Sequence, residues 1–353
     1  MTLPLTIPGA PSAGNCPTSI NHPQAPVSPS SSVQALALPP PIESAASTPC
    51  LVEEDGTDDD YADNDYGDDD VAGPAPDGGG RCLSIARASS TVRAVEGGKT
   101  LLKDVPMHVA GLVEITLLYK ALANLTFGAI GLLGRSECGL ASAEEEARLR
   151  LLTPTIKGYA AHWATAGMEQ AMGALGGLGY MEEAGIGRLI RDAMVEKIWE
   201  GTISVCALDL TRAVSKEPKA VTYYIEWGRS LIQAAQARLH SPALQAVETL
   251  SASLQRLPIY FGESVTNALL TTPLLNYFAA ISCALYLLEH ATWSRNVKEA
   301  SSEVDLEAFR RWVEEGEIAH THVQMTKARE DYHRRIALNS KIVYGGDVLA
   351  AKL

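Results

Sequence analysis

The residues with the clearest potential for chemistry lie in the stretch VEKIWEGT, residues 195–202, which precedes an apolar, helix-like run. Glu200 stands there between Trp199 and Gly201, and Thr202 follows. A glutamate at the start of a helix is stabilised by the helix dipole, and many such residues have no further role. A carboxylate with apolar neighbours can instead act as a general base, because burial raises its pKa. The local sequence fits both interpretations of Glu200.

A second group of candidate residues lies in GALGGLGY, residues 173–180, and is followed by the pair Arg191 and Asp192. Gly176 and Gly177 come directly after a predicted helix, where glycines commonly form a C-cap and a turn. The pattern is not a dinucleotide-binding fingerprint, because no strand precedes it and it ends a helix instead of opening one. Taken alone, these glycines indicate a turn.

The elements that must position these residues are helices, because helical periodicity continues from Arg81 onward and no segment alternates as a strand would. Pro106 suits a first helical turn, Ser142 with Glu145 forms a capping box, and Thr202 is a candidate N-cap. The expected helices span 82–95, 105–135, 142–174, 188–198, 203–214, 220–239, 241–257, 262–294 and 303–338. The predicted fold class is therefore all-α, with about eight helices.

Charge divides the chain into two parts. Residues 1–80 contain 13 acidic residues and no Lys or Arg, which leaves 29 acidic against 29 basic residues in the remainder. The first part is rich in Pro, Ser, Gly and Asp and cannot bury enough apolar surface to fold, so we expect a disordered tail. That tail is either an acidic interaction segment or a passive leader. The neutral remainder lacks the basic surface that nucleic-acid binding requires, so no nucleic-acid partner is expected.

Cysteine and histidine spacing argues against a metal site. The six cysteines are scattered, at positions 16, 50, 82, 138, 206 and 283, with no CxxC pair, and this pattern is typical of reduced intracellular thiols. His320 and His322 lie two apart on a predicted helix, so they do not share a face.

Residues 264–288 are uncharged and long enough to span a membrane, but Pro273 and the polar residues favour a buried helix, and no membrane association is expected.

Targeting signals leave two locations open. The N-terminus has neither the basic and apolar regions of a secretory signal nor the arginines of a mitochondrial presequence. The chain ends in Ala351, Lys352 and Leu353, a variant of the Ser-Lys-Leu peroxisomal address. We expect an intracellular protein that is peroxisomal if this signal is read and cytoplasmic otherwise.

The combination of GGLGY, the Arg191–Asp192 pair, IWEGT and LDLTRA resembles the C-terminal helical domain of the acyl-CoA dehydrogenases, and most closely their alkylation-response, AidB-like branch. ARASSTVRAV resembles the first helix of that domain, with Ser89 where a tyrosine is usual. The resemblance implies a four-helix bundle over 81–215, followed by a helical extension over 216–353. It also implies that the N-terminal helical domain and the middle β-domain of the family are lacking.

The activity implied by the resemblance is oxidation of an acyl-CoA thioester to the enoyl-CoA, with hydride transfer to FAD. Glu200 then corresponds to the base that removes the α proton, with Ile198 and Trp199 as an apolar environment. In the family, the developing enolate is stabilised by hydrogen bonds from a flavin hydroxyl and from the main-chain N–H of the base. The chain would work as a homo-oligomer, because the flavin lies between subunits.

The resemblance also implies cofactor contacts, one residue at a time. Arg93 matches the arginine that contacts the flavin pyrophosphate, and Gly176 and Gly177 match glycines that approach the FAD of a neighbouring subunit. Thr202 matches a flavin-contacting hydroxyl. Ser204 stands where Gln or Asn is common.

Three departures from the family pattern bear on function. Gly173 replaces a usual Gln, Ser204 replaces an amide, and the family's arginine near CoA has no counterpart around Asp68. The alternative to the enzyme is therefore a non-catalytic helical oligomerisation module derived from the same family. A nucleic-acid role by analogy with the AidB-like branch conflicts with the neutral and acidic charge distribution.

Overall fold

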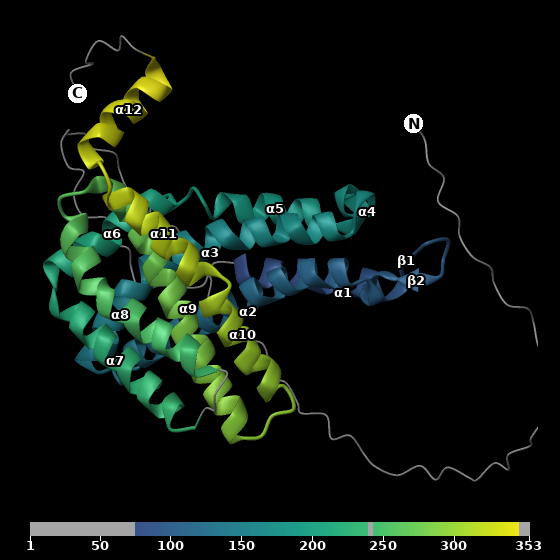
Figure 1. The fold of residues 1–353 in the computed structure, drawn as a ribbon, viewed down its shortest axis with the longest axis horizontal. Helices are drawn as coiled ribbons and strands as arrows, with labels where there is room; N and C mark the ends of the chain where they lie inside the picture. Colours follow the sequence, from purple (N-terminus) through teal and green to yellow (C-terminus); the bar gives the residue numbers. More distant parts are fainter. Residues whose placement is uncertain (1–74, 239–242, 346–353) are drawn as a thin grey trace, which may run out of the picture. The chain divides into compact units, whose positions relative to one another are not determined.

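In the computed structural model, residues 75–238 and 243–345 are described, and they are almost entirely helical (Figure 1). Most of the predicted tail and the C-terminal Ala351, Lys352 and Leu353 lie outside these ranges. The α-helices are α1 (Ala75–Val92), α2 (Pro106–Glu137), α3 (Ala143–Ala174), α4 (Gly177–Tyr180), α5 (Ile186–Val195), α6 (Ile203–Lys216), α7 (Lys219–Gln236), α8 (Leu244–Ser264), α9 (Thr271–Asn296), α10 (Ser302–Glu314), α11 (Glu317–Arg329) and α12 (Tyr332–Tyr344). Short 3-10 turns cover Leu102–Asp104, Glu182–Ala184 and Ala268–Leu270. The predicted all-α fold class is confirmed.

Local sequence signals begin the two long helices where they were expected. Pro106 occupies the first turn of α2. At the start of α3, the Ser142 hydroxyl accepts from the Glu145 N–H at 3.3 Å, and the Glu145 carboxylate accepts from the Ser142 N–H at 2.9 Å. This reciprocal pair is the predicted capping box. Pro154 lies inside α3 and is buried.

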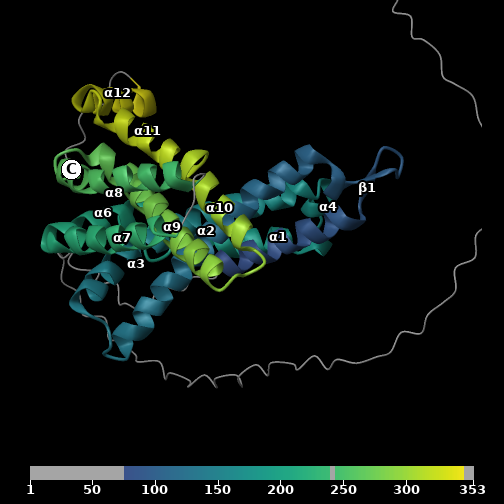
Figure 2. The same ribbon diagram turned by 60° about the horizontal axis from the view of Figure 1, so that its bottom comes forward.

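The core is organised around α9, whose residues are mostly buried. It packs against α2, α3, α6, α7, α8, α10 and α11 (Figures 1 and 2). Within the described residues two helices, α2 and α9, are long and apolar enough to cross a membrane, and the apolar window of α9 is 72% buried, which is typical of a core helix. Buried residues of both predicted halves, 81–215 and 216–353, belong to one hydrophobic cluster.

The first helix begins at Ala75, seven residues before the expected helix over 82–95 and inside the segment that was expected to be disordered. We expected the glycine-rich stretch before Arg81 to be disordered, but its glycines allow close helix packing. A Cβ on Gly78 would lie 2.7 Å from Cε of Met168, and a Cβ on Gly80 would lie 2.8 Å from Oη of Tyr119. Glycine at position 80 therefore lets α1 approach the Tyr119 ring of α2, while the flexible end of Met168 could move away from a Cβ at position 78.

A small hairpin corrects the expectation that the chain contains no strands. β1 (Ala94–Val95) pairs with β2 (Thr100–Leu101) in an antiparallel ladder, with Ala94 opposite Leu101. The turn between them contains three residues with positive φ: Glu96 at +53°, Gly97 at +70° and Gly98 at +93°. Strands of two residues are too short to show alternation, so periodicity could not reveal them.

The C-terminal half contains more breaks than the sequence indicated. The helix predicted over 262–294 is interrupted before α9 by a 3-10 turn, where the Asn267 side chain accepts from the Leu269 N–H at 3.0 Å. The helix predicted over 303–338 is three helices, which are separated at Gly316 and at Asp331 with its φ of +50°. The last of these, α12, has no buried residue and lies at the edge of the helical body (Figure 1).

The cysteines in the described part of the chain are free: Cys138 is exposed, and Cys82, Cys206 and Cys283 are buried. Burial raises the pKa of the Cys82 thiol to about 11. The same part of the chain holds no group of three or more His, Cys, Asp or Glu side chains that could bind a metal ion.

A buried carboxylate joins α2, α9 and α10. The Asp305 side chain is 2% exposed and accepts from Lys120 at 2.7 Å, from Ser294 at 2.9 Å and from Ser301 at 2.8 Å. Nε2 of His290 lies 3.7 Å from the same carboxylate. Burial acts to raise the pKa of Asp305, but the hydrogen bonds from Lys120 and the two serines outweigh it and lower the pKa below its ordinary value.

We expect Asp305→Ala to lower the free energy of unfolding by about 2 kcal/mol, because it leaves buried donors without an acceptor, while the partial exposure of Lys120 screens part of the lost attraction. Chemical denaturation at neutral pH measures the change. Glu303→Ala, an exposed acid in the first turn of the same helix, is the control and should cost less than about 0.5 kcal/mol. Equal effects of the two substitutions would show that the buried Asp305 carboxylate does not stabilise the fold in this way.

The same carboxylate predicts a pH dependence. Since its folded pKa is lowered, the stability it contributes is present above the ordinary carboxyl pKa of about 3.9 and is lost as the pH falls through the folded value. The difference in stability between the wild type and Asp305→Ala should therefore shrink in acid. Denaturation curves across the acid range measure it, and a difference that stays constant would refute the prediction.

Candidate functional site

The loop that carries Glu200 connects α5 to α6 and has an unusual backbone. Glu200 has φ of +56° and Gly201 has φ of +115°. Before them, the Trp199 N–H donates to the Val195 carbonyl at 3.1 Å, and the Trp199 indole N–H donates to the Glu196 carboxylate at 2.9 Å. A non-glycine residue with positive φ is uncommon, and such residues are frequent in functional sites.

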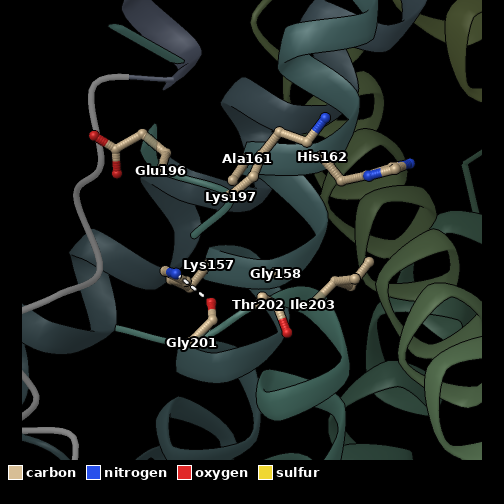
Figure 3. Close-up of a pocket in the computed structure, with 9 residues that line it drawn as sticks. All are labelled: Lys157, Gly158, Ala161, His162, Glu196, Lys197, Gly201, Thr202 and Ile203. Carbon is tan, nitrogen blue, oxygen red and sulfur yellow. Dashed lines mark hydrogen bonds between the residues drawn. The ribbon is translucent and has the colours of Figure 1, made fainter. Parts of the chain in front are cut away.

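Lys157 of α3 holds this loop from behind. Its ammonium donates to the carbonyl of Trp199 and, at 2.5 Å, to the carbonyl of Gly201. Figure 3 shows Lys157 directed from α3 toward Gly201. A small hollow of about 60 Å³ lies beside these groups and is lined by Lys157, Gly158, Ala161, His162, Glu196, Lys197, Gly201, Thr202 and Ile203. This volume is below the usual range of about 300–1,000 Å³ for ligand pockets, so we treat the hollow as space behind the loop.

The hollow also contains a titratable ring. Burial lowers the pKa of His162, and the neighbouring Lys197 lowers it further. The His162 imidazole meets Trp163 edge-on, with ring centroids 5.4 Å apart. The neutral form of the ring is therefore favoured at physiological pH.

The expected apolar environment of Glu200 is not formed by its sequence neighbours. Ile198 is 68% exposed and Trp199 is 51% exposed, and Glu200 itself is exposed. The prediction that these two side chains desolvate the carboxylate is therefore wrong for a single chain. Both residues lie beyond the end of α5 at Val195, in the exposed loop before α6.

Thr202 occupies the N-cap position of α6, but its role there differs from the prediction. Its carbonyl accepts from the Cys206 N–H at 3.0 Å, while its hydroxyl makes no capping hydrogen bond. The prediction that Thr202 is the N-cap residue is confirmed, but the expected side-chain hydrogen bond is not formed. The hydroxyl-bearing residues Thr202 and Ser204 both lie at the surface.

The other predicted cofactor residues lie together at the end of α3. Nη1 of Arg93 donates to the carbonyl of Leu175 at 2.5 Å, directly before Gly176. Gly176 has φ of +64° and ψ of −146°, a conformation that is almost restricted to glycine. A Cβ on Gly176 would lie 3.4 Å from the Arg93 guanidinium, whereas a Cβ on Gly177 would meet open space. The structure therefore brings Arg93, Gly176 and Gly177 into one surface group.

The two groups of predicted residues are well separated within one chain. Lys157, behind Glu200, and Leu175, beside Arg93, both belong to α3 or its C-cap. They are 18 residues apart, so a helical rise of 1.5 Å per residue puts them roughly 27 Å from one another. Within one chain, Glu200, Thr202 and Ser204 therefore lie together at the start of α6. Arg93, Gly176 and Gly177 lie together at the end of α3.

The orientation of α6 depends on residues that the sequence did not single out. Arg150 of α3 forms a two-pronged ion pair with Asp209 of α6, at 2.9 and 2.8 Å. Gly158 allows the helices to approach, because a Cβ there would lie 3.1 Å from Cβ of Cys206. Sequence reasoning also missed Lys157, although a lone lysine in the apolar stretch LLTPTIKGYAA was a usable signal.

The chemistry of the two groups fits FAD, the cofactor implied by the resemblance. The Arg93 guanidinium and the open backbone at Gly176 and Gly177 suit an anionic diphosphate. The hydroxyls of Thr202 and Ser204, exposed at the start of α6, can hydrogen-bond to a polar ring.

Comparisons with known proteins confirm the family resemblance. Residues 121–215 match the acyl-CoA dehydrogenase C-terminal domain. Acyl-CoA dehydrogenase family member 11 of Caenorhabditis elegans is 31% identical over 231 residues, which cover 64% of this chain and 37% of that protein. The putative acyl-CoA dehydrogenase AidB of Escherichia coli is 31% identical over 137 residues, which cover 39% of this chain and 24% of that protein. The chain therefore spans less than two fifths of the length of these curated relatives.

A solved structure confirms the fold. The crystal structure of C. elegans ACDH-11 in complex with C11-CoA matches with a TM-score of 0.68 at 24% identity. The match covers 78% of this chain and 46% of that one. The shared fold therefore extends beyond the segment matched by the domain family and into the C-terminal helices.

The backbone at the glycine pair gives a matched prediction. Gly176→Ala should lower the free energy of unfolding by about 1–3 kcal/mol, because alanine is strained at this positive φ. Gly177→Ala should be neutral or stabilising, since Gly177 begins α4 and its Cβ would meet nothing within 4 Å. Thermal and chemical denaturation of the two variants measure the difference, and equal stabilities would show that the turn does not have this conformation.

Proposed function

We propose that this chain, whose residues 121–215 belong to the acyl-CoA dehydrogenase C-terminal domain family, takes part in FAD-dependent oxidation of an acyl-CoA thioester to the enoyl-CoA. The observation that carries the proposal is the conformation of Glu200. The residue that the family pattern assigns as base is held with positive φ, at the surface, directly ahead of α6.

Glu200 would remove the α proton of the thioester. An α proton beside a thioester is weakly acidic, so the base must be positioned within hydrogen-bond reach and protected from water. The N-terminus of α6 carries a partial positive charge, which favours negative charge developing next to it. Since the side chains next to Glu200 leave it exposed, the substrate, the cofactor and a neighbouring chain would have to exclude the water.

FAD, when bound, supplies the acceptor for the β hydride. Arg93, Gly176 and Gly177 would hold its diphosphate through the guanidinium and the main chain. Thr202 and Ser204 would orient its ring with their hydroxyls. The protein's contribution is binding and orientation, while the redox chemistry belongs to the cofactor.

The separation of the two groups supports a homo-oligomer. Groups roughly 27 Å apart on one helix can serve one compact reaction centre if a second copy brings its own arginine and glycines toward Glu200. Exposed apolar side chains beside both groups support such an interface. They are Leu178, Tyr180, Met181, Met194, Val195, Ile198 and Trp199.

The substrate class rests on relatives. ACDH-11 of C. elegans was crystallised in complex with C11-CoA, and its similarity to this chain supports an acyl-CoA substrate. Peroxisomal import through Ala351, Lys352 and Leu353 stays a prediction.

A non-catalytic helical oligomerisation module is the second candidate function. The observation in its favour is the exposure of every assigned site residue in the single chain: Arg93, Gly176, Gly177, Glu200, Thr202 and Ser204. Such a module would form helical oligomers without taking up flavin, and Glu200 would be dispensable.

The decisive prediction concerns Glu200. Protein purified and incubated with FAD should reduce an electron-acceptor dye when an acyl-CoA is added. Glu200→Gln should lower this rate by about 10²–10⁴-fold while bound flavin, measured by its absorbance, is retained. Glu217→Gln, at the opposite end of α6, is the control and should leave the rate unchanged.

Two results would contradict the proposal. Wild-type protein that takes up no flavin and reduces no dye would favour the oligomerisation module. A Glu200→Gln variant with the wild-type rate would show that another group removes the proton.

A further inference from the structure

Glu200 presents a conformational problem. A glutamate with positive φ is less stable than the same residue in an ordinary helical or extended conformation, by about 1–3 kcal/mol. The conformation therefore persists only if surrounding groups fix it. A group that contacts the main chain on either side of the Glu200 Cα can fix it directly.

Lys157 makes such contacts. It donates to the carbonyls of Trp199 and Gly201, the residues on either side of Glu200. A single ammonium can reach both carbonyls only if the chain turns between them. The positive φ angles of Glu200 and Gly201 supply that turn.

The position of Lys157 on α3 leaves its side chain little alternative. Ile156 and Gly158, its neighbours in sequence, are buried, and Lys157 itself is half-buried where α3 meets the start of α6. A partly buried ammonium requires acceptors, and two carbonyl oxygens satisfy it. The Cys206 thiol also donates to the Gly201 carbonyl, at 3.7 Å. A thiol is a weak donor, and this contact reaches only one of the two carbonyls that flank Glu200.

We propose that Lys157 is the positioning residue that holds Glu200 in its left-handed conformation and thereby aims the carboxylate outward from the loop. The inference rests on the proposed function, because it assigns Lys157 a task in the same site. Lys157 touches the loop backbone and acts through Glu200.

Three variants test the proposal. Lys157→Met keeps most of the side-chain volume and removes the donors. Lys157→Arg keeps a cation with several donors and should restore much of the loss. Lys197→Met removes a different cation that lines the same hollow and serves as the control.

Two measurements separate positioning from general stability. The first is hydrogen exchange of the amides in residues 198–206, which should become faster in Lys157→Met while exchange in α9 stays unchanged. The second is dye reduction per bound flavin, where kcat should fall by about 100-fold with KM for the acyl-CoA unchanged, because a misplaced base slows the reaction without weakening binding. A purely structural role would lower the melting temperature but leave kcat per bound flavin intact.

The outcomes are distinguishable. A Lys157→Met variant with wild-type exchange and wild-type kcat overturns the inference, as does a Lys197→Met variant with equal losses. Wild-type protein without dye reduction overturns the proposed function, and the exchange measurement then decides whether Lys157 holds the loop. Faster exchange in Lys157→Met that is reversed in Lys157→Arg supports the inference in either case.

Discussion

The close contact between α3 and α6 at Gly158 is the constraint on which the candidate site depends. A side chain at this position would require the facing residues of α6 to shift by a few tenths of an ångström, because its Cβ would lie 3.1 Å from Cβ of Cys206. With the helices at this distance, Arg150 reaches Asp209 and Lys157 reaches the loop before α6. The position of Glu200 is thus a consequence of helix packing, with a short loop fixed between two packed elements.

The C-terminal helices support this contact from the other side. α9 packs against both α3 and α6, and its own position is tied to α2 and α10 through Asp305. The buried carboxylate helps to fix the relative orientation of these helices. Its hydrogen bonds are directional, whereas apolar contacts are not. The helices that the sequence separated as an extension therefore belong to the same core as the domain that carries the site.

Features set by neighbours in sequence could be predicted, and features set by distant contacts could not. The Ser142–Glu145 capping box and the helix start at Pro106 are local, and the structure has both. The family pattern of glycines and IWEGT led to the domain family that residues 121–215 match. The start of α1 was misjudged because a run of glycines has the composition of a flexible segment, and only the opposing Tyr119 reveals its packing role. The clamp by Lys157 lies more than forty residues from the loop that it holds, beyond the reach of any local pattern.

The separation of the two residue groups along α3 has a genetic consequence. If two copies pair so that each site takes Glu200 from one chain and Arg93 from the other, then each chain contributes to two different sites. An allele damaged at Arg93 and an allele damaged at Glu200 would each be inactive alone. Mixed oligomers of the two would contain one site built only from undamaged halves, so the alleles would complement each other within a single gene.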